Sequence, residues 1–314
     1  MSNESGSLSL RAENVQSSYR ALFEVALSLF ERAKDAFFYS SAYLVLVAIA
    51  EVVTVTYALS VELNAAPVVV GLVTFAVYMG DRIADVDTDE LSNPDQCAFV
   101  RRHYRVLSVL SAASYGLAIA LSMLGGPLAL AITLLPGAFW ILYASDWLPS
   151  VGAQFSRLKD VLVVNSAVVA AAWAVAVVFL PLAFADAAFT STAAVVFAYF
   201  FVDTFVNTEI PNVGDRAADE AIGVSTLPVV FGVARTRQIL HALNLALVPL
   251  LGFALLAGLV STPVTVGILV GVAAVSVVVS FLGRTDNGRL LSVASEAKSL
   301  LVVGVVLLAS TAGL

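Results

Sequence analysis

Residues 66–90 read APVVVGLVTFAVYMGDRIADVDTDE, an apolar run that ends directly in a cluster of acids. Asp81, Asp85 and Asp89 are spaced i, i+4, i+8, so in a helix they lie on one face. Like charges at this spacing repel one another and weaken the helix. A bound cation would remove that repulsion, so the stretch predicts an apolar helix whose acidic end forms a cation site.

The whole chain shares the apolar character of this stretch. Of its 314 residues 60% are hydrophobic and 12% charged, whereas a soluble domain of this size carries about a quarter charged residues. The composition predicts an all-α, polytopic membrane protein, and the absence of a basic stripe argues against a nucleic-acid partner. Apolar runs of membrane-spanning length occur nine times, roughly at residues 37–60, 66–81, 105–124, 127–145, 161–181, 190–207, 239–258, 263–282 and 297–313.

The basic residues predict the orientation of these spans. All 16 Lys and Arg fall on one side of the predicted membrane, in the loops at 1–36, 82–104, 146–160, 208–238 and 283–296 or at the helix ends beside them. The opposite loops contain none. Because basic loops stay in the cytoplasm, we expect a cytoplasmic N-terminus, an external C-terminus and nine spans, in an integral protein of the cytoplasmic membrane.

The N-terminal segment, residues 1–36, has a different character from the rest. Its acids and late apolar stretch do not resemble a signal peptide. Leu22, Leu29 and Phe37 share one helical face and Glu24 and Glu31 share another, which predicts an amphipathic helix on the cytoplasmic membrane surface. Residues 37–314 would then form one transmembrane domain. The single cysteine, Cys97, excludes an internal disulfide.

A second acid cluster lies about 130 residues after the first. Asn212, Asp215 and Asp219 have the same i, i+3, i+7 spacing as Arg82, Asp85 and Asp89. Each cluster follows an even-numbered span at the predicted cytoplasmic surface, which is typical of a weak internal repeat. The repeat predicts two acid-bearing helix ends that face each other across a central cavity.

The chemistry of these clusters favours a hard metal ion. Asp and Asn oxygens suit Mg²⁺, which takes one or two carboxylates and completes its coordination with water and phosphate. One Cys and two distant His disfavour a softer metal. Two carboxylate walls beside an apolar cavity predict a site for a polyprenyl diphosphate, whose tail would lie among the membrane helices.

These residues together resemble the UbiA superfamily of intramembrane prenyltransferases. That family has nine transmembrane helices and two motifs, N-D-x-x-D-x-x-x-D and D-x-x-D-x-x-x-D, the second followed by G-x-x-T-L-P. The second matches NVGDRAADEAIGVSTLPVVFG at residues 212–232, with Asn212 in place of the first Asp. The first matches at Asp85 and Asp89, but Asp81 replaces the family Asn and Arg82 its neighbouring Asp.

A third segment, SRLK at residues 156–159, resembles the basic segment of the family. The resemblance implies that Asp85 and Asp89 bind one Mg²⁺ and that Asp215 and Asp219 bind a second, with Asp81 and Asn212 assisting. The negative charge of the leaving diphosphate would also be neutralised by basic side chains, those of Arg82, Arg157 and Lys159.

The resemblance also implies a reaction in which the allylic carbon–oxygen bond breaks to leave a carbocation. Tyr143, with Trp140, is a candidate to face this cation. Glu209, with Glu51 and Asp203, is a candidate to orient the acceptor or to remove its proton. The expected donor is a polyprenyl diphosphate, of which geranylgeranyl diphosphate is one candidate, and the expected acceptor is lipophilic.

Two alternatives stay open at this point. A terpene cyclase on the same scaffold would let a double bond of the donor's own chain attack the cation. A non-catalytic protein that binds or transports a lipid diphosphate would use the same acids without turnover. Transport is disfavoured because the acids gather at one surface and the opposite face is nearly uncharged.

Overall fold

The computed structural model describes residues 23–87, 90, 93–144, 164–285 and 287–313. After a helical segment at residues 23–39, nine long α-helices make up the described chain, and these ranges contain no strand. The helices are α2 (Ala42–Leu59), α3 (Ala66–Ala84), α4 (Pro94–Ser122), α5 (Gly126–Ala144), α7 (Val164–Phe184), α8 (Ser191–Ile222), α9 (Leu227–Leu256), α10 (Thr262–Ser280) and α11 (Gly288–Thr311).

The length and composition of these helices are those of a polytopic membrane protein. Within the described ranges, 8 helical segments are long and apolar enough to cross a bilayer. One of them, Pro94–Pro136, contains α4 and much of α5, which a short 3₁₀ turn at Met123–Gly125 separates. The predicted all-α membrane fold is therefore confirmed.

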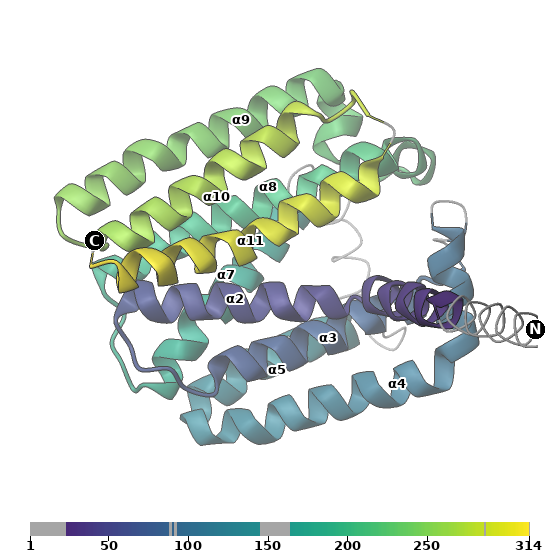
Figure 1. Cartoon of the computed structure of the whole chain (residues 1–314), viewed down its shortest axis with the longest axis horizontal. Coiled ribbons are helices and arrows are strands. Elements are labelled where there is room, and N and C mark those ends of the chain that lie inside the picture. Colours follow the sequence, from purple (N-terminus) through teal and green to yellow (C-terminus); the bar gives the residue numbers. More distant parts are fainter. Residues whose placement is uncertain (1–22, 88–89, 91–92, 145–163, 286, 314) are drawn as a thin grey trace, which may run out of the picture.

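Helices that follow one another along the chain pack side by side. The pairs α2/α3, α3/α4, α7/α8, α8/α9 and α10/α11 are in contact, and α11 also packs against α2. Figure 1 shows this closure, with the yellow α11 beside the violet α2 although they stand at opposite ends of the chain. The closed bundle surrounds an interior that is lined by helices from both halves of the sequence.

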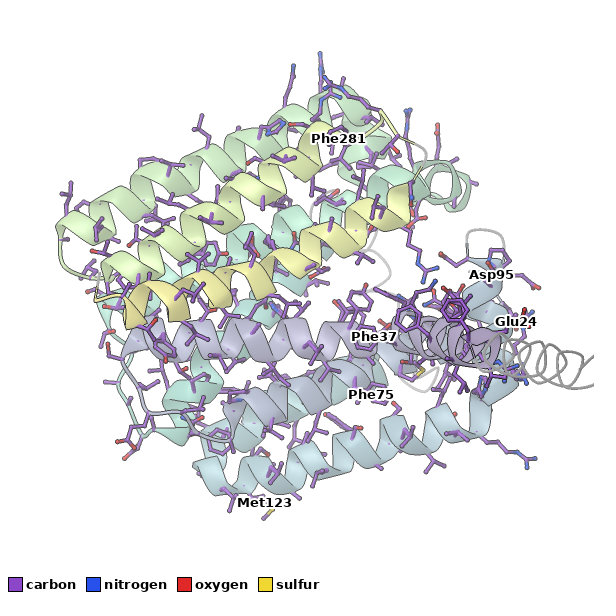
Figure 2. All side chains as sticks on the ribbon, in the orientation of Figure 1. Glu24, Phe37, Phe75, Asp95, Met123 and Phe281 are labelled. Atoms are coloured by element: carbon purple, nitrogen blue, oxygen red, sulfur yellow. The ribbon has the colours of Figure 1, made fainter. Side chains whose placement is uncertain are left out.

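Large apolar side chains cover the outside of the bundle. Leu245, Leu256 and Leu308 are 69%, 90% and 72% exposed, which is expected of helix faces that contact lipid rather than water. Figure 2 shows side chains projecting along the whole length of the helices, with Met123 at the edge of the bundle.

Two segments that the sequence predicts as long polar loops are largely helical. In place of a loop at 208–238, α8 continues to Ile222 and α9 begins at Leu227; in place of a loop at 82–104, α4 begins at Pro94. These predictions were wrong because hydropathy detects only the apolar part of a helix, and polar residues can continue the helix into water. Gly223 ends α8 in the left-handed conformation, with φ 78°.

The predicted helix through Asp81, Asp85 and Asp89 is also wrong in part. Helix α3 ends at Ala84, and Asp85 stands just after it with its N–H donating to the Asp81 carbonyl at 2.8 Å. The chain then turns at residues 86–87. Ending the helix here avoids stacking three like charges on one face.

The N-terminal prediction falls partly outside the described residues. From residue 23 to residue 39 the chain is helical, and its apolar side chains Phe23, Leu29 and Phe30 are 69%, 57% and 64% exposed. Lys34 pairs with Glu31 on this helix. An amphipathic helix with an uncovered apolar side fits the predicted surface position, which stays a prediction, as do the cytoplasmic orientation and the division at residue 36.

Candidate functional site

A polar pocket lies inside the bundle, among five helices. Its free volume of about 50 Å³ is large enough to hold water. Its walls are Leu44, Val47 and Glu51 from α2, Thr74 and Tyr78 from α3, Val169 and Trp173 from α7, Thr204, Asn207 and Thr208 from α8, and Glu296 from α11.

One face of α8 connects this pocket to the second acid cluster. Thr204, Thr208, Asn212, Asp215 and Asp219 follow at intervals of three or four residues, so they share a helical face. Thr204 and Thr208 line the pocket. At 1.5 Å of rise per residue, Asp215 lies about 10 Å further along the helix than Thr208.

Helix α3 brings the first acid cluster to the same end of the bundle. Tyr78 lines the pocket, and Asp81 follows three residues later. Tyr78 lies within electrostatic range of Asp81, Glu51 and Glu296. In Figure 1, α3 and α8 both end on the side where the N-terminal helix lies. The two helices that line the pocket, from opposite halves of the chain, therefore each lead to one of the predicted acid clusters.

Three side chains donate hydrogen bonds to acids of α8. The Thr226 hydroxyl donates to Asp219 Oδ2 at 3.2 Å, across the turn that joins α8 to α9. The Asn212 amide donates to Glu209 Oε2 at 3.2 Å, and Ser166 of α7 donates to Glu209 Oε1 at 2.6 Å. Glu209 is only 1% exposed and is not among the pocket walls given above. This bond uses the Asn212 amide nitrogen and not the amide oxygen.

The donor set at this end of the bundle fits Mg²⁺. Asp81, Asp85 and Asp215 are exposed carboxylates, and Asp219 is half-buried. In the part of the chain that the structure describes, no three His, Cys, Asp or Glu side chains are close enough to hold an ion by themselves. Mg²⁺ commonly uses one or two carboxylates and fills its other positions with water and phosphate, so these residues suit an ion bound together with a phosphate ligand.

Arg82, which replaces an acid of the family motif, is held between helices. Its Nε donates to Ser41 Oγ at 2.8 Å and its Nη1 to Gln96 Oε1 at 2.7 Å. Gln96 in turn donates to the Tyr39 carbonyl at 3.2 Å, and Arg289 stacks over the Tyr39 ring with Cζ 4.7 Å from the ring centroid. Two arginines thus stand at the pocket end of the bundle.

Several predicted site residues cannot be placed. Asp89, Arg157 and Lys159 lie outside the described residues. Tyr143 and Trp140 belong to α5, but their side chains lie outside the described part of the structure.

Glu51 of α2 is the carboxylate whose surroundings are most fully defined. It is 4% exposed, and its two oxygens accept separate hydrogen bonds. Trp173 Nε1 donates to Oε2 at 2.6 Å and Ser299 Oγ donates to Oε1 at 2.8 Å. Partners from α7 and α11 therefore hold this carboxylate at the pocket wall.

A buried ion pair lies beside this group. Lys298 Nζ is 3.0 Å from Asp203 Oδ2 and also donates to the Ser295 carbonyl at 3.1 Å. Sequence reasoning treated Lys298 only as one of the cytoplasmic basic residues and did not single out Trp173, Glu296 or Ser299. A lysine within an apolar helix was the available signal, because an unpaired charge is costly there.

Outside the membrane spans, one arginine forms ion pairs with the acids that come after Asp85. Arg101 of α4 donates to Asp87 Oδ1 at 2.8 Å and to both oxygens of Glu90 at 2.8 Å. Its guanidinium lowers the pKa of the Glu90 carboxyl through these hydrogen bonds and its charge. These ion pairs thus connect Asp87 and Glu90 to α4.

Comparisons with known proteins agree with this architecture. The model of the UbiA prenyltransferase family matches residues 43–294. No curated protein sequence matches the chain.

Solved structures show the same fold at low sequence identity. A UbiA homologue from Archaeoglobus fulgidus bound to GPP and Mg²⁺ is 15% identical, with a TM-score of 0.58 over 86% of this chain and 99% of that one. A structure described as giving insight into digeranylgeranylglyceryl phosphate synthase in membranes is 16% identical, with a TM-score of 0.55 over 89% and 97%. The predicted family resemblance is confirmed.

Proposed function

Since the chain belongs to the UbiA prenyltransferase family, we propose that it ionises a polyprenyl diphosphate with Mg²⁺ and transfers the prenyl group to a lipophilic acceptor. The observation that carries the proposal is the pocket between α3 and α8, with acids of the two clusters at the ends of these helices: Asp81 and Asp85 at the end of α3, and Asp215 and Asp219 on α8. The homologue bound to GPP and Mg²⁺ supports the donor class and the metal.

The residues that would hold Mg²⁺ are those at the acid-bearing ends of the two helices. Asp85 and Asp89 would bind one ion and Asp215 and Asp219 another, with Asp81 and Asn212 assisting. Bound there, Mg²⁺ would neutralise the diphosphate as charge develops on the leaving oxygen. Glu209 would hold the Asn212 amide in place, because its carboxylate accepts a hydrogen bond from that amide. Glu209 is absent from the pocket walls given above.

Basic side chains would share the charge of the diphosphate. Arg82 is fixed by Ser41 and Gln96, so its remaining N–H groups have a set direction. Arg157 and Lys159 would approach from the segment between α5 and α7. Tyr143 would face the allylic cation by its ring, and the apolar bundle would exclude the water that destroys such a cation.

The proposed location of the protein is the cytoplasmic membrane, with the acid clusters on the cytoplasmic side. It is an integral membrane protein, and the one-sided placement of its basic residues supports a position of the acid clusters at the cytoplasmic surface of the cytoplasmic membrane. A soluble diphosphate-bearing end could then reach the acids while the prenyl chain stays in the bilayer.

The test is release of diphosphate from geranylgeranyl diphosphate by the purified protein in lipid, with Mg²⁺ or with EDTA. We expect release that requires Mg²⁺ and falls at least about 100-fold in Asp85→Asn and in Asp215→Asn, because each removes charge stabilisation from the transition state. The matched control is Asp95→Asn, an exposed acid in the first turn of α4, which should keep the wild-type rate.

The organic product separates the alternatives. Transfer to a component of an added lipid extract supports the prenyltransferase, and a cyclic hydrocarbon formed without extract would replace it by a cyclase. Binding of prenyl diphosphates of several lengths without any release of diphosphate would overturn the enzymatic proposal in favour of a binding protein.

A further inference from the structure

We propose that Glu51 is the base that accepts the proton lost when the prenyl cation forms its new bond. The inference rests on the proposed function, since it assigns a catalytic residue to that site. A cation that forms a new carbon–carbon bond inside the bundle leaves a proton, which a base beside the pocket has to accept.

Glu51 has the position and the free lone pairs that this role needs. It lines the pocket at 4% exposure, nine residues after the start of α2. Trp173 donates to one carboxylate oxygen and Ser299 to the other. A carboxylate offers about four lone-pair positions, so two remain after these bonds, on a group whose orientation is set from two helices.

The other buried carboxylates do not line the pocket. Asp203 pairs with Lys298, and Glu209 accepts from Ser166 and Asn212; neither is among the pocket walls, whereas Glu51 is.

Glu296 does line the pocket, but it lies nearer the end of the bundle where the acid clusters are. It precedes Ser299, the partner of Glu51, by one helical turn of α11. It also lies within electrostatic range of Tyr43 at the start of α2, whereas Glu51 is about 12 Å further along that helix. Glu51 is thus the deeper carboxylate, away from the departing diphosphate.

The charge around the pocket suits a cationic intermediate. Lys298 is neutralised by Asp203 at 3.0 Å, and the described walls contain two glutamates but neither Lys nor Arg. Asn207 Oδ1, also at the wall and buried, accepts no hydrogen bond from the described residues. Such acceptor oxygens, in a medium of low dielectric, attract positive charge more strongly than they would in water.

The bond changes balance as follows. The allylic carbon–oxygen bond breaks and its electron pair stays on the diphosphate. The π electrons of an acceptor double bond form the new carbon–carbon bond and leave a cation on the acceptor. A neighbouring C–H pair then becomes the new double bond, and its proton goes to Glu51 Oε. Without an acceptor, the prenyl cation loses its own proton in the same way and becomes an unsaturated hydrocarbon.

The test uses radiolabelled geranylgeranyl diphosphate with and without a lipid extract. It measures diphosphate release together with the ratio of deprotonated products, meaning transferred product and hydrocarbon, to the prenyl alcohol that water forms. We expect Glu51→Gln to keep diphosphate release within about threefold of wild type, because ionisation occurs at the acid clusters. The ratio of deprotonated products to alcohol should fall by about 100-fold, the lower range of general-base effects.

The matched comparison is Glu296→Gln, the second carboxylate of the pocket. It is expected to change the total rate without lowering that ratio. A fall of the ratio in Glu296→Gln rather than in Glu51→Gln overturns the proposal, as does a wild-type ratio in Glu51→Gln. Loss of diphosphate release in a folded Glu51→Gln also overturns it, because Glu51 would then serve ionisation.

A second variant covers the case in which Glu51→Gln does not fold. Trp173→Phe combined with Ser299→Ala keeps the carboxylate but removes both groups that orient it, and should lower the product ratio by about tenfold. An unchanged ratio contradicts the assignment of Glu51. If the wild-type protein releases no diphosphate from donors of several lengths, the proposed function itself fails and the role of Glu51 falls with it, an outcome distinct from those above.

Discussion

Lys298 of α11 and Asp203 of α8 form an ion pair inside the bundle, with Nζ 3.0 Å from Oδ2 and side chains that are 1% and 2% exposed. The pair joins the last helix to the helix that carries the second acid cluster. Asp203 also neutralises the charge of Lys298, the only buried lysine among the described residues, so the pair adds no net charge beside the pocket. Its main effect is therefore on the position of α8 and on the charge that Glu51 experiences.

Breaking this pair should be much more costly than replacing it. Lys298→Met leaves a buried carboxylate without its partner, and should lower the free energy of unfolding by about 3–5 kcal/mol. The double variant Lys298→Met with Asp203→Leu should recover most of this loss, since neither charge remains buried. Denaturant unfolding in detergent measures both values. A double variant as unstable as the single one would show that the charges themselves hold the helices.

The bond from Thr226 to Asp219 should tune the affinity for Mg²⁺. Thr226→Val removes the hydroxyl that orients this carboxylate while keeping the shape of the side chain. Losses of this kind lower metal affinity by about 10- to 100-fold. We expect the Mg²⁺ concentration for half-maximal diphosphate release to rise at least tenfold in Thr226→Val. In Thr226→Ser, which keeps the hydroxyl, it should stay close to wild type; equal values in the two variants would contradict the prediction.

Arg101 should lower the Mg²⁺ requirement at the first acid cluster without binding the ion itself. Arg101→Gln breaks its bonds to Asp87 and Glu90, which frees the turn that follows Asp85. The expected result is a rise of a few-fold in the Mg²⁺ requirement, with overall stability nearly unchanged because the pair is exposed. Arg102→Gln removes the same charge from the neighbouring exposed position and is the control. A similar effect of both variants would point to net charge instead of the ion pair.

The contact between α10 and α11 depends on two glycines. A Cβ on Gly267 would lie 2.5 Å from Val306 Cγ2 and 3.1 Å from the Val302 carbonyl oxygen, and one on Gly271 would lie 2.5 Å from Val302 Cγ2. Small residues at this spacing let membrane helices approach closely. Gly267→Ala should therefore destabilise the protein by about 1–3 kcal/mol, measured by thermal unfolding. Gly252→Ala, within α9 and with open space around it, should be neutral or stabilising.

Much of the site could be predicted from the sequence because its signals are local. The spacing of Asp215 and Asp219 places both carboxylates on one face once the segment is helical, as it is in α8. Apolar runs of 20 residues and one-sided basic loops likewise follow from the bilayer alone. These features led to the membrane fold, the family and the metal-binding candidates.

The ends of the helices were harder to predict. The polar continuation of α8 to Ile222 has no apolar signal, so hydropathy predicts a loop there. Conversely, the spacing of Asp81, Asp85 and Asp89 predicts a longer helix, but α3 ends at Ala84. Like-charge repulsion favours that end, whereas α8 stays helical through Asp215 and Asp219.

The sequence by itself determined that this chain crosses a membrane as helices and carries two acid clusters, because both are properties of hydropathy and helical spacing. Only the tertiary structure decided which charged groups meet. Glu51 and Ser299 are 248 residues apart, and Asp203 and Lys298 face each other only because α11 packs against α2 and α8. Contacts between distant segments depend on how the helices close into a bundle, which no local pattern encodes.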